Sequence, residues 1–129
     1  MPLDSKQLNS QFEMLLPVLI GCISSEAQVH SNVAKAIPML LKFGGLLSAE
    51  DLFLIINYVC SVLRAEYSIM GNLEDALLSL NILVSNQPSE ILLPNAAQVV
   101  RSATKLLSHK KRLLRKLAAD VKNNWEVYT

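Results

Sequence analysis

Apolar residues recur along most of this chain at intervals of three and four, and strict alternation of apolar and polar positions is absent. Intervals of three and four place apolar side chains on one face of an α-helix, whereas a strand needs a period of two. Glycine is scarce, with 4 in 129 residues, so few positions interrupt the helical pattern. The pattern therefore predicts an all-α fold.

Start and stop signals divide this pattern into six predicted helices. They are expected at about 5–22, from the 25–28 segment to 43, 48–65, 72–86, 89–107 and from 109 into the C-terminal region. The connections between them are short, so successive helices should pack antiparallel, as three hairpins.

Capping signals support three of the helix starts. Ser48 and Asp51 have the spacing of a capping box, and so do Ser25 and Gln28. Asn72 is expected to be the cap of the fourth helix because its short polar side chain can accept a hydrogen bond from the first turn.

Glycine and proline mark the expected ends and bends. The second helix should stop at Gly44-Gly45. Three predicted helices contain a proline, Pro17, Pro38 or Pro94. Because an interior proline removes a backbone hydrogen bond, each of these helices must bend or begin at the proline.

A weak internal repeat organises the six helices. The tripeptide "LLP" occurs at 15–17 and again at 92–94, a separation of 77 residues, or two periods of about 38 or 39. A helical pair of this length is typical of HEAT or armadillo repeats, which stack into a solenoid. We therefore predict one domain, 1–129, that forms a HEAT-type α-solenoid of about three antiparallel pairs, at about 4–43, 48–86 and 89–126. An ordinary six-helix bundle is the alternative.

Composition adds an expectation about context. Hydrophobic residues make up 51% of the chain and the mean hydropathy is +0.32, which is rich for an isolated domain. A piece of a longer solenoid, whose end faces stack on neighbouring repeats, would account for this high hydropathy.

The longest apolar stretch, "LFLIINYVCSVL", is too short to span a bilayer. Cys22 and Cys60 lie in apolar runs and are expected to be buried thiols in a reducing compartment.

Charge is distributed unevenly. Residues 44–87 carry one basic and five acidic groups, whereas residues 88–129 carry eight basic and three acidic groups. On a helical wheel the last helix places Leu113, Leu114, Leu117, Ala118, Val121 and Trp125 on one face. The basic residues of this region are the candidate partner-binding residues: Arg101, Lys105, Lys110, Lys111, Arg112, Arg115, Lys116 and Lys122.

Three interpretations of this basic stripe remain open: a solvated helix face, a protein-binding surface, or a nucleic-acid-binding surface. Exposed cations attract phosphate. However, the aromatic residues nearby are Trp125, expected on the buried face, and Tyr128. A stacking platform for bases is therefore not indicated, and direct nucleic-acid binding is disfavoured.

No enzyme constellation can be read from the chain. His30 and His109 are the only histidines, and the sequence around neither shows the carboxylate and nucleophile of a catalytic arrangement. There is no phosphate-binding glycine loop and no zinc-binding H-E-x-x-H. The acidic pairs at 50–51 and 74–75 are expected at helix N-termini, where they suit the helix dipole. We expect no catalytic residues, no metal ligands and no cofactor.

The segment "ILLPNAAQVVRSATKLLSHKKRLLRKLAADVKNNWEVYT" resembles the extreme C-terminus of the methyl-methanesulfonate-sensitivity (MMS) HEAT-repeat protein family. The resemblance covers about a third of the chain, and "ADVKNN" departs from the family pattern. It rests on Leu92-Leu93-Pro94, Gln98-Val99, Arg101, Lys110-Lys111-Arg112-Leu113, Arg115-Lys116, Ala118 and Trp125.

The resemblance implies a function that the residues alone do not. Members of the family are non-enzymatic adaptors of cytosolic iron–sulfur protein assembly. Their C-terminal region docks the other targeting subunits, a WD-repeat propeller protein and a small partner, and the complex delivers clusters to apoproteins that include DNA repair and replication enzymes. The chain would then be the C-terminal part of a longer solenoid, in the cytoplasm and nucleus. The alternatives are an unrelated HEAT scaffold for transport or cytoskeletal partners and a basic nucleic-acid-binding module.

Overall fold

The computed structural model describes residues 5–25, 31–65 and 69–129, and these residues contain helices and no strand. Because α5, η1 and α6 follow one another without a gap, the helices form six segments, and the prediction of an all-α fold with six helices is confirmed. The elements are α1 (Ser5–Ser25), α2 (Ser31–Leu41), α3 (Ala49–Arg64), α4 (Met70–Asn86), α5 (Ser89–Leu92), the 3-10 helix η1 (Leu93–Asn95), α6 (Ala96–Thr104) and α7 (Arg112–Glu126).

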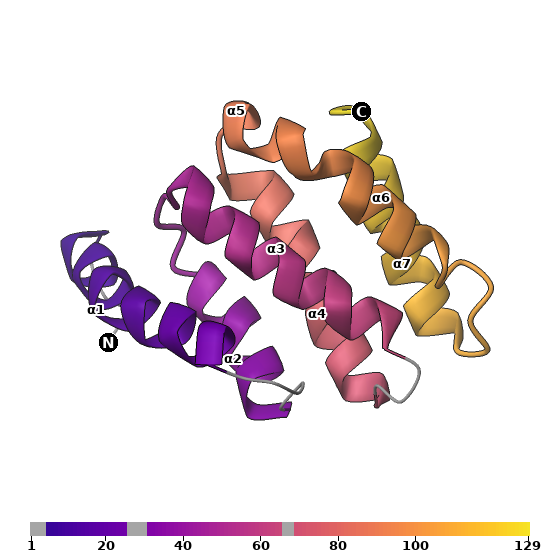
Figure 1. Ribbon diagram of the computed structural model, residues 1–129, viewed down its shortest axis with the longest axis horizontal. Helices are drawn as coiled ribbons and strands as arrows, with labels where there is room; N and C mark the ends of the chain where they lie inside the picture. Colours follow the sequence, from indigo (N-terminus) through magenta and orange to yellow (C-terminus); the bar gives the residue numbers. More distant parts are fainter. Residues whose placement is uncertain (1–4, 26–30, 66–68) are drawn as a thin grey trace.

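The helices form three pairs that follow one another along the long axis of the molecule (Figure 1). Within the pairs, α1 packs on α2, α3 on α4, and α6 on α7. Between the pairs, α2, α4 and α7 make one layer, in which α4 contacts both others, and α1, α3 and α6 make a second layer around α3. The three pairs fall within the predicted units 4–43, 48–86 and 89–126, and their assignment to HEAT repeats remains a prediction.

The hydrophobic core is continuous from the first pair to the third, and its fully buried residues lie in the second and third pairs. The middle pair is covered from both sides, so its apolar side chains lose nearly all contact with water. The apolar residues with no exposed surface in this pair are Leu52, Ile55, Ile56, Cys60, Leu77, Leu80 and Leu83. Burial of side chains of this size stabilises the fold by about 1.5–3 kcal/mol each.

The predicted caps have different outcomes. Ser48 caps α3, since its hydroxyl accepts a hydrogen bond from the amide of Asp51 at 3.1 Å. The prediction for Asn72 is wrong: α4 begins two residues earlier, at Met70, so Asn72 lies inside the first turn and is buried. Ser25 is the last residue of α1, and Gln28 lies outside the described residues.

Glycine and proline act largely as predicted. Gly44 has a φ of 77°, the left-handed conformation that ends a helix, and it lies three positions after the last residue of α2. Pro17 and Pro38 lie inside α1 and α2. Pro94 lies in η1, so the single helix predicted over 89–107 is divided into α5, η1 and α6. Proline has no amide hydrogen to bond back along the helix, which suits a change of helix type at Pro94. The missing bond does not by itself divide a helix, since α1 and α2 continue through Pro17 and Pro38.

Gln87, at the end of α4, ties the first pair to the second. Its Oε1 accepts a hydrogen bond from the amide of Leu47 at 2.9 Å, and its Nε2 donates to the carbonyl of Gly45 at 3.0 Å. Asn86 beside it donates from Nδ2 to the carbonyl of Leu41 at 3.1 Å. The connection between α2 and α3 is thereby fixed by side chains, which satisfy backbone groups that no helix satisfies.

Trp125 ties the third pair to the second. Its indole is fully buried, and its Nε1 donates a hydrogen bond to the carbonyl of Leu80 in α4 at 2.9 Å. The prediction that this side chain lies on the core face of the last helix is therefore correct. A buried indole nitrogen needs such a partner, since an unmatched polar group in the core costs about 1–3 kcal/mol.

Candidate functional site

The basic region lies on the third pair, whose last helix, α7, has one buried face and one exposed face. In α7 the buried positions are Leu114, Ala118, Val121 and Trp125, which recur at intervals of three and four. The prediction that Leu113 belongs to the same face is wrong, because 51% of its side chain is exposed. The packed stripe of α7 is thus narrower than the wheel predicts, and the surface next to the basic residues includes one leucine.

Arg115 holds the loop before α7. Its Nη1 donates hydrogen bonds to the carbonyl of His109 at 2.8 Å and to that of Lys110 at 3.1 Å. In the same loop, Nδ1 of His109 accepts a hydrogen bond from the amide of Lys111 at 3.0 Å. The exposed guanidinium of Arg115 therefore supports the backbone of 109–111, and a change at this position alters loop shape as well as charge.

Lys122 is partly neutralised. Its Nζ lies 2.8 Å from a carboxylate oxygen of Glu126, one turn further along α7, and the lysine is half-buried. An exposed pair of this kind contributes at most about 0.5 kcal/mol to stability, but it removes net charge from this part of the surface.

The remaining cations of the loop and of α7 are exposed, and within the described part of the chain none of them forms an ion pair. They are Lys110, Lys111, Arg112 and Lys116. Since no intramolecular carboxylate holds them, their side chains are available to a negatively charged partner.

Two of the predicted residues meet elsewhere, in a hollow of about 240 Å³ between α3 and α6. Arg101 and Lys105 line this hollow together with Arg64, from the end of α3. None of the cations of α7 lines it. The polar side chains of Gln98 and Ser102 complete the wall. The hollow therefore brings three positively charged side chains together.

Arg64 is the cationic residue of this hollow that sequence reasoning misses. It belongs to the acidic middle of the chain, where it is the only basic residue between 44 and 87. It joins Arg101 and Lys105 because α3 packs against α6. The contact connects residues 37 positions apart, and no spacing in the sequence signals it.

Cys60 is buried next to Ser102, one of the residues that line this hollow. Burial raises the pKa of its thiol, and a hydrogen bond with Ser102 and the positive charges of Arg64 and Arg101 offset part of the effect. The prediction that Cys60 is buried is confirmed. The thiol stays protonated at neutral pH, so we assign Cys60 a packing role.

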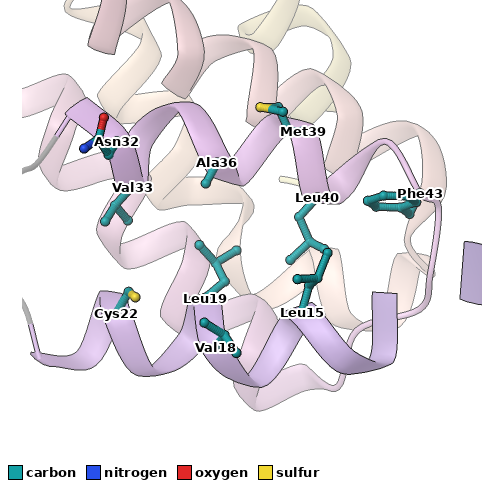
Figure 2. A pocket seen from close by; sticks show the side chains of 10 residues that line it. All are labelled: Leu15, Val18, Leu19, Cys22, Asn32, Val33, Ala36, Met39, Leu40 and Phe43. Carbon is teal, nitrogen blue, oxygen red and sulfur yellow. The ribbon is translucent and has the colours of Figure 1, made fainter. Parts of the chain in front are cut away.

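A second surface, at the opposite end of the molecule, is apolar. Figure 2 shows a groove between α1 and α2, into which side chains from both helices point. The groove has a volume of about 500 Å³. Its lining is aliphatic and aromatic apart from Cys22 and Asn32, and it comprises Leu15, Val18, Leu19, Cys22, Asn32, Val33, Ala36, Met39, Leu40 and Phe43.

This end of the molecule leaves large apolar side chains in water. The exposed fraction is 73% for Met14, 64% for Val18 and 68% for Met39. Cys22 is also exposed, so the prediction that it is buried is wrong. The helical period correctly marks these residues as apolar-face residues, but it does not tell whether another element covers the face.

Two further findings concern membranes and metals. Within the described ranges, no helix is both long enough and apolar enough to cross a membrane. The same ranges contain no group of three or more His, Cys, Asp and Glu side chains placed to hold a metal ion.

Comparison of the sequence with models of known protein families and with curated proteins gave no match.

Proposed function

We propose that this chain is a non-enzymatic adaptor, a HEAT-type helical scaffold of the cytosolic iron–sulfur protein assembly targeting complex. It docks the other targeting subunits, a WD-repeat protein and a small partner, and helps deliver clusters to apoproteins that include DNA repair and replication enzymes, in the cytoplasm and nucleus. The sequence resemblance of residues 91–129 to the MMS HEAT-repeat family supports the choice of complex.

The observation that carries the proposal of an adaptor is the set of cations exposed on the third pair and on the adjoining end of α3. Arg101 and Lys105 stand with Arg64 around one hollow, and Arg112 and Lys116 are exposed on α7. Buried charges are usually paired within a protein. Exposed charges without an intramolecular partner can pair with opposite charges on another molecule. We infer that an acidic protein surface binds here.

The aromatic residues favour an acidic protein over a nucleic acid. Proteins that bind single strands combine a positive groove with exposed aromatic rings on which bases stack. Here Trp125 is fully buried, and Tyr128 is half-buried and packs against the core. Carboxylates need no such platform, because a guanidinium binds them directly through two parallel hydrogen bonds.

The proposal is tested by size-exclusion chromatography of the chain mixed with the WD-repeat targeting subunit and its small partner. The informative variant is Arg112→Glu with Lys116→Glu, which reverses two exposed charges without touching the loop contacts of Arg115. A matched control is Lys35→Glu with Lys42→Glu, the same charge change at exposed positions on and just after α2.

We expect the unmodified chain and the control to co-elute with the targeting subunits. The variant should lose about tenfold or more in affinity, which corresponds to about 1.4 kcal/mol. Helicity measured by circular dichroism should be the same in all three. Separate elution of the unmodified chain would contradict the assignment to this complex. Equal affinity of variant and control would remove the α7 cations from the binding surface.

A further inference from the structure

The hollow between α3 and α6 collects positive charge from two different helices. Its lining residues from α6 and the position after it recur at intervals of three and four, which places them on one helix face. They are Gln98, Arg101, Ser102 and Lys105. Lys105 keeps a helical backbone, with φ −61° and ψ −25°. Arg64, the last residue of α3, lines the hollow from the other helix. No carboxylate is among the described residues that line it.

The buried side of the hollow gives a second sign that its cations converge. Ser102 is only 2% exposed. Burial raises the pKa of the neighbouring Cys60 thiol, while a hydrogen bond with Ser102 and the positive charges of Arg64 and Arg101 lower it. Because the effect of a charge weakens with distance, two arginines from different helices must both lie close to this one buried thiol.

Helix ends explain each arginine separately but not the group. Positive side chains stabilise helix C-termini, and Arg64 and Arg101 lie in the last turns of α3 and α6. However, Arg101 and Lys105 are four residues apart on one face, where like charges destabilise a helix. Arg64 adds a third positive charge, and no ion pair within the described ranges neutralises any of the three. An anion in the hollow would offset this repulsion.

The number of cations favours a phosphoryl group over a carboxylate. A carboxylate brings one negative charge and two oxygens. A phosphorylated side chain brings a charge of about −1.5 to −2 at neutral pH and three strong acceptor oxygens. Clusters of arginine are the usual means by which proteins recognise phosphorylated side chains. No aromatic residue is among the described residues that line the hollow, so the base of a nucleotide would find no ring to stack on.

We infer that the hollow lined by Arg64, Arg101 and Lys105 is a binding site for a phosphoryl group, carried on a serine or threonine side chain of a partner protein. The two guanidinium groups and the ammonium group donate to its oxygens, and the amide of Gln98 is a further donor in the wall. The inference rests on the proposed function in one point, that this part of the molecule binds a protein. It makes phosphorylation of that protein a means of strengthening the contact.

The experiment is a titration of the purified full chain, followed by NMR of the arginine side chains. The probe is a blocked tripeptide with a central phosphoserine between two glycines, so that the phosphoryl group is its only charge. The comparison ligands are the same tripeptide with glutamate in place of phosphoserine, and inorganic phosphate alone. The titrations are made at low ionic strength, because salt screens exposed charges.

The test variants are Arg64→Gln and Arg101→Gln, each of which removes one charge from the hollow. The matched control is Arg112→Gln, the same change at an exposed position of α7 that does not line the hollow. Circular dichroism verifies that each variant is folded.

We expect the phosphoserine tripeptide to shift the side-chain signals of Arg64 and Arg101 in a saturable way. It should bind about tenfold tighter than the glutamate tripeptide, and each test variant should lose about tenfold in affinity. Arg112→Gln should bind as the unmodified chain does. Equal affinity for the two tripeptides, or equal losses in Arg101→Gln and Arg112→Gln, would overturn the inference. Tighter binding of inorganic phosphate than of the tripeptide would overturn the assignment to a protein partner.

The titration contains no targeting subunit, so its outcome is separate from the co-elution that tests the proposed function. Binding of the tripeptide without co-elution would support the phosphoryl site and contradict the assignment to the targeting complex. Co-elution without binding of the tripeptide would support the complex and overturn the phosphoryl site.

Discussion

The first and third helix pairs share one architecture and expose opposite chemistry. At the first pair, Met14, Val18 and Met39 face the solvent beside an apolar groove. At the third pair, Arg112 and Lys116 face the solvent, and buried apolar residues line the other side of α7. In stacked helical proteins a polar outer face ends the stack, whereas an apolar one is completed by a neighbour. The comparison shows that the exposed surface is apolar at the first pair and largely basic at the third.

The two end pairs are also attached to the middle pair by different means. The third pair is attached through the buried indole of Trp125 and its hydrogen bond to Leu80. At the first pair, the polar clamp that Gln87 makes with Leu47 and Gly45 fixes the connection from α2 to α3, in addition to the packing of α2 on α4. Removal of a buried indole and removal of a polar side chain should lower the free energy of unfolding by different amounts. The two ends can therefore be compared by measuring the stability of variants.

Trp125→Ala should have the largest effect. It removes a fully buried side chain and leaves the carbonyl of Leu80 without its partner, so the free energy of unfolding should fall by about 3–5 kcal/mol. Urea denaturation followed by circular dichroism measures it. Trp125→Phe, which retains an aromatic ring, should lose less. A loss below about 1 kcal/mol for Trp125→Ala would show that α7 is not anchored here.

Gln87→Leu should have the next largest effect. The substitution leaves the buried amide of Leu47 and the carbonyl of Gly45 unpaired, at a cost of about 1–3 kcal/mol. Ser85→Ala is the control, since this exposed hydroxyl bonds only the carbonyl one turn back, and its loss should stay within about 0.5 kcal/mol. Equal unfolding midpoints for the two variants would mean that the clamp contributes nothing.

Two glycine substitutions at the first pair should change the stability of the protein in opposite directions. A Cβ at Gly45 would overlap the ring of Phe12, so Gly45→Ala should destabilise the protein by about 1–3 kcal/mol. At Gly21, inside α1, a Cβ meets nothing, so Gly21→Ala should stabilise the protein by about 0.5–1 kcal/mol. Thermal unfolding reports both, and shifts of the same sign would contradict the described packing.

The smallest expected effect is a dependence of stability on alkaline pH. Burial raises the pKa of Cys60 above the ordinary value of 9.0. As the pH rises, the unfolded chain therefore loses this proton before the folded protein does. The contribution of Cys60 to stability is complete below pH 9.0 and declines above it, by at most about 1.4 kcal/mol per pH unit.

Urea titrations between neutral and alkaline pH measure this slope. Cys60→Ala lowers stability at every pH because it leaves a small cavity, but it should remove the part of the slope that the thiol causes. Identical slopes for the variant and the unmodified protein would assign the pH dependence to other groups.

Local sequence signals predict much of this fold. The helical period places six helical segments, Ser48 is the cap of α3, and Gly44 follows the end of α2. These features depend on neighbouring residues, so the sequence contains the information. Asn72 fails as a cap because α4 gains another turn upstream from Met70, although Ile69, the residue at the cap position, offers no side-chain hydrogen bond.

Features that depend on which faces meet are harder to predict. Leu113 and Cys22 lie in apolar patterns, yet both are exposed, because no described helix packs over them. Arg64 joins the basic hollow only through the contact of α3 with α6. The periodicity of the sequence identifies the apolar or basic face of a helix. Which other helix packs against that face depends on the three-dimensional arrangement.

The dependence of the complex on salt tests the central claim that the cations of the third pair bind an acidic protein surface. The measurement is light scattering of the chain mixed with the WD-repeat subunit and its small partner, at low salt and at about 1 M salt, where charges are screened beyond about 3 Å. We expect the complex to form at low salt and to dissociate at high salt. A complex that salt does not weaken would contradict the claim.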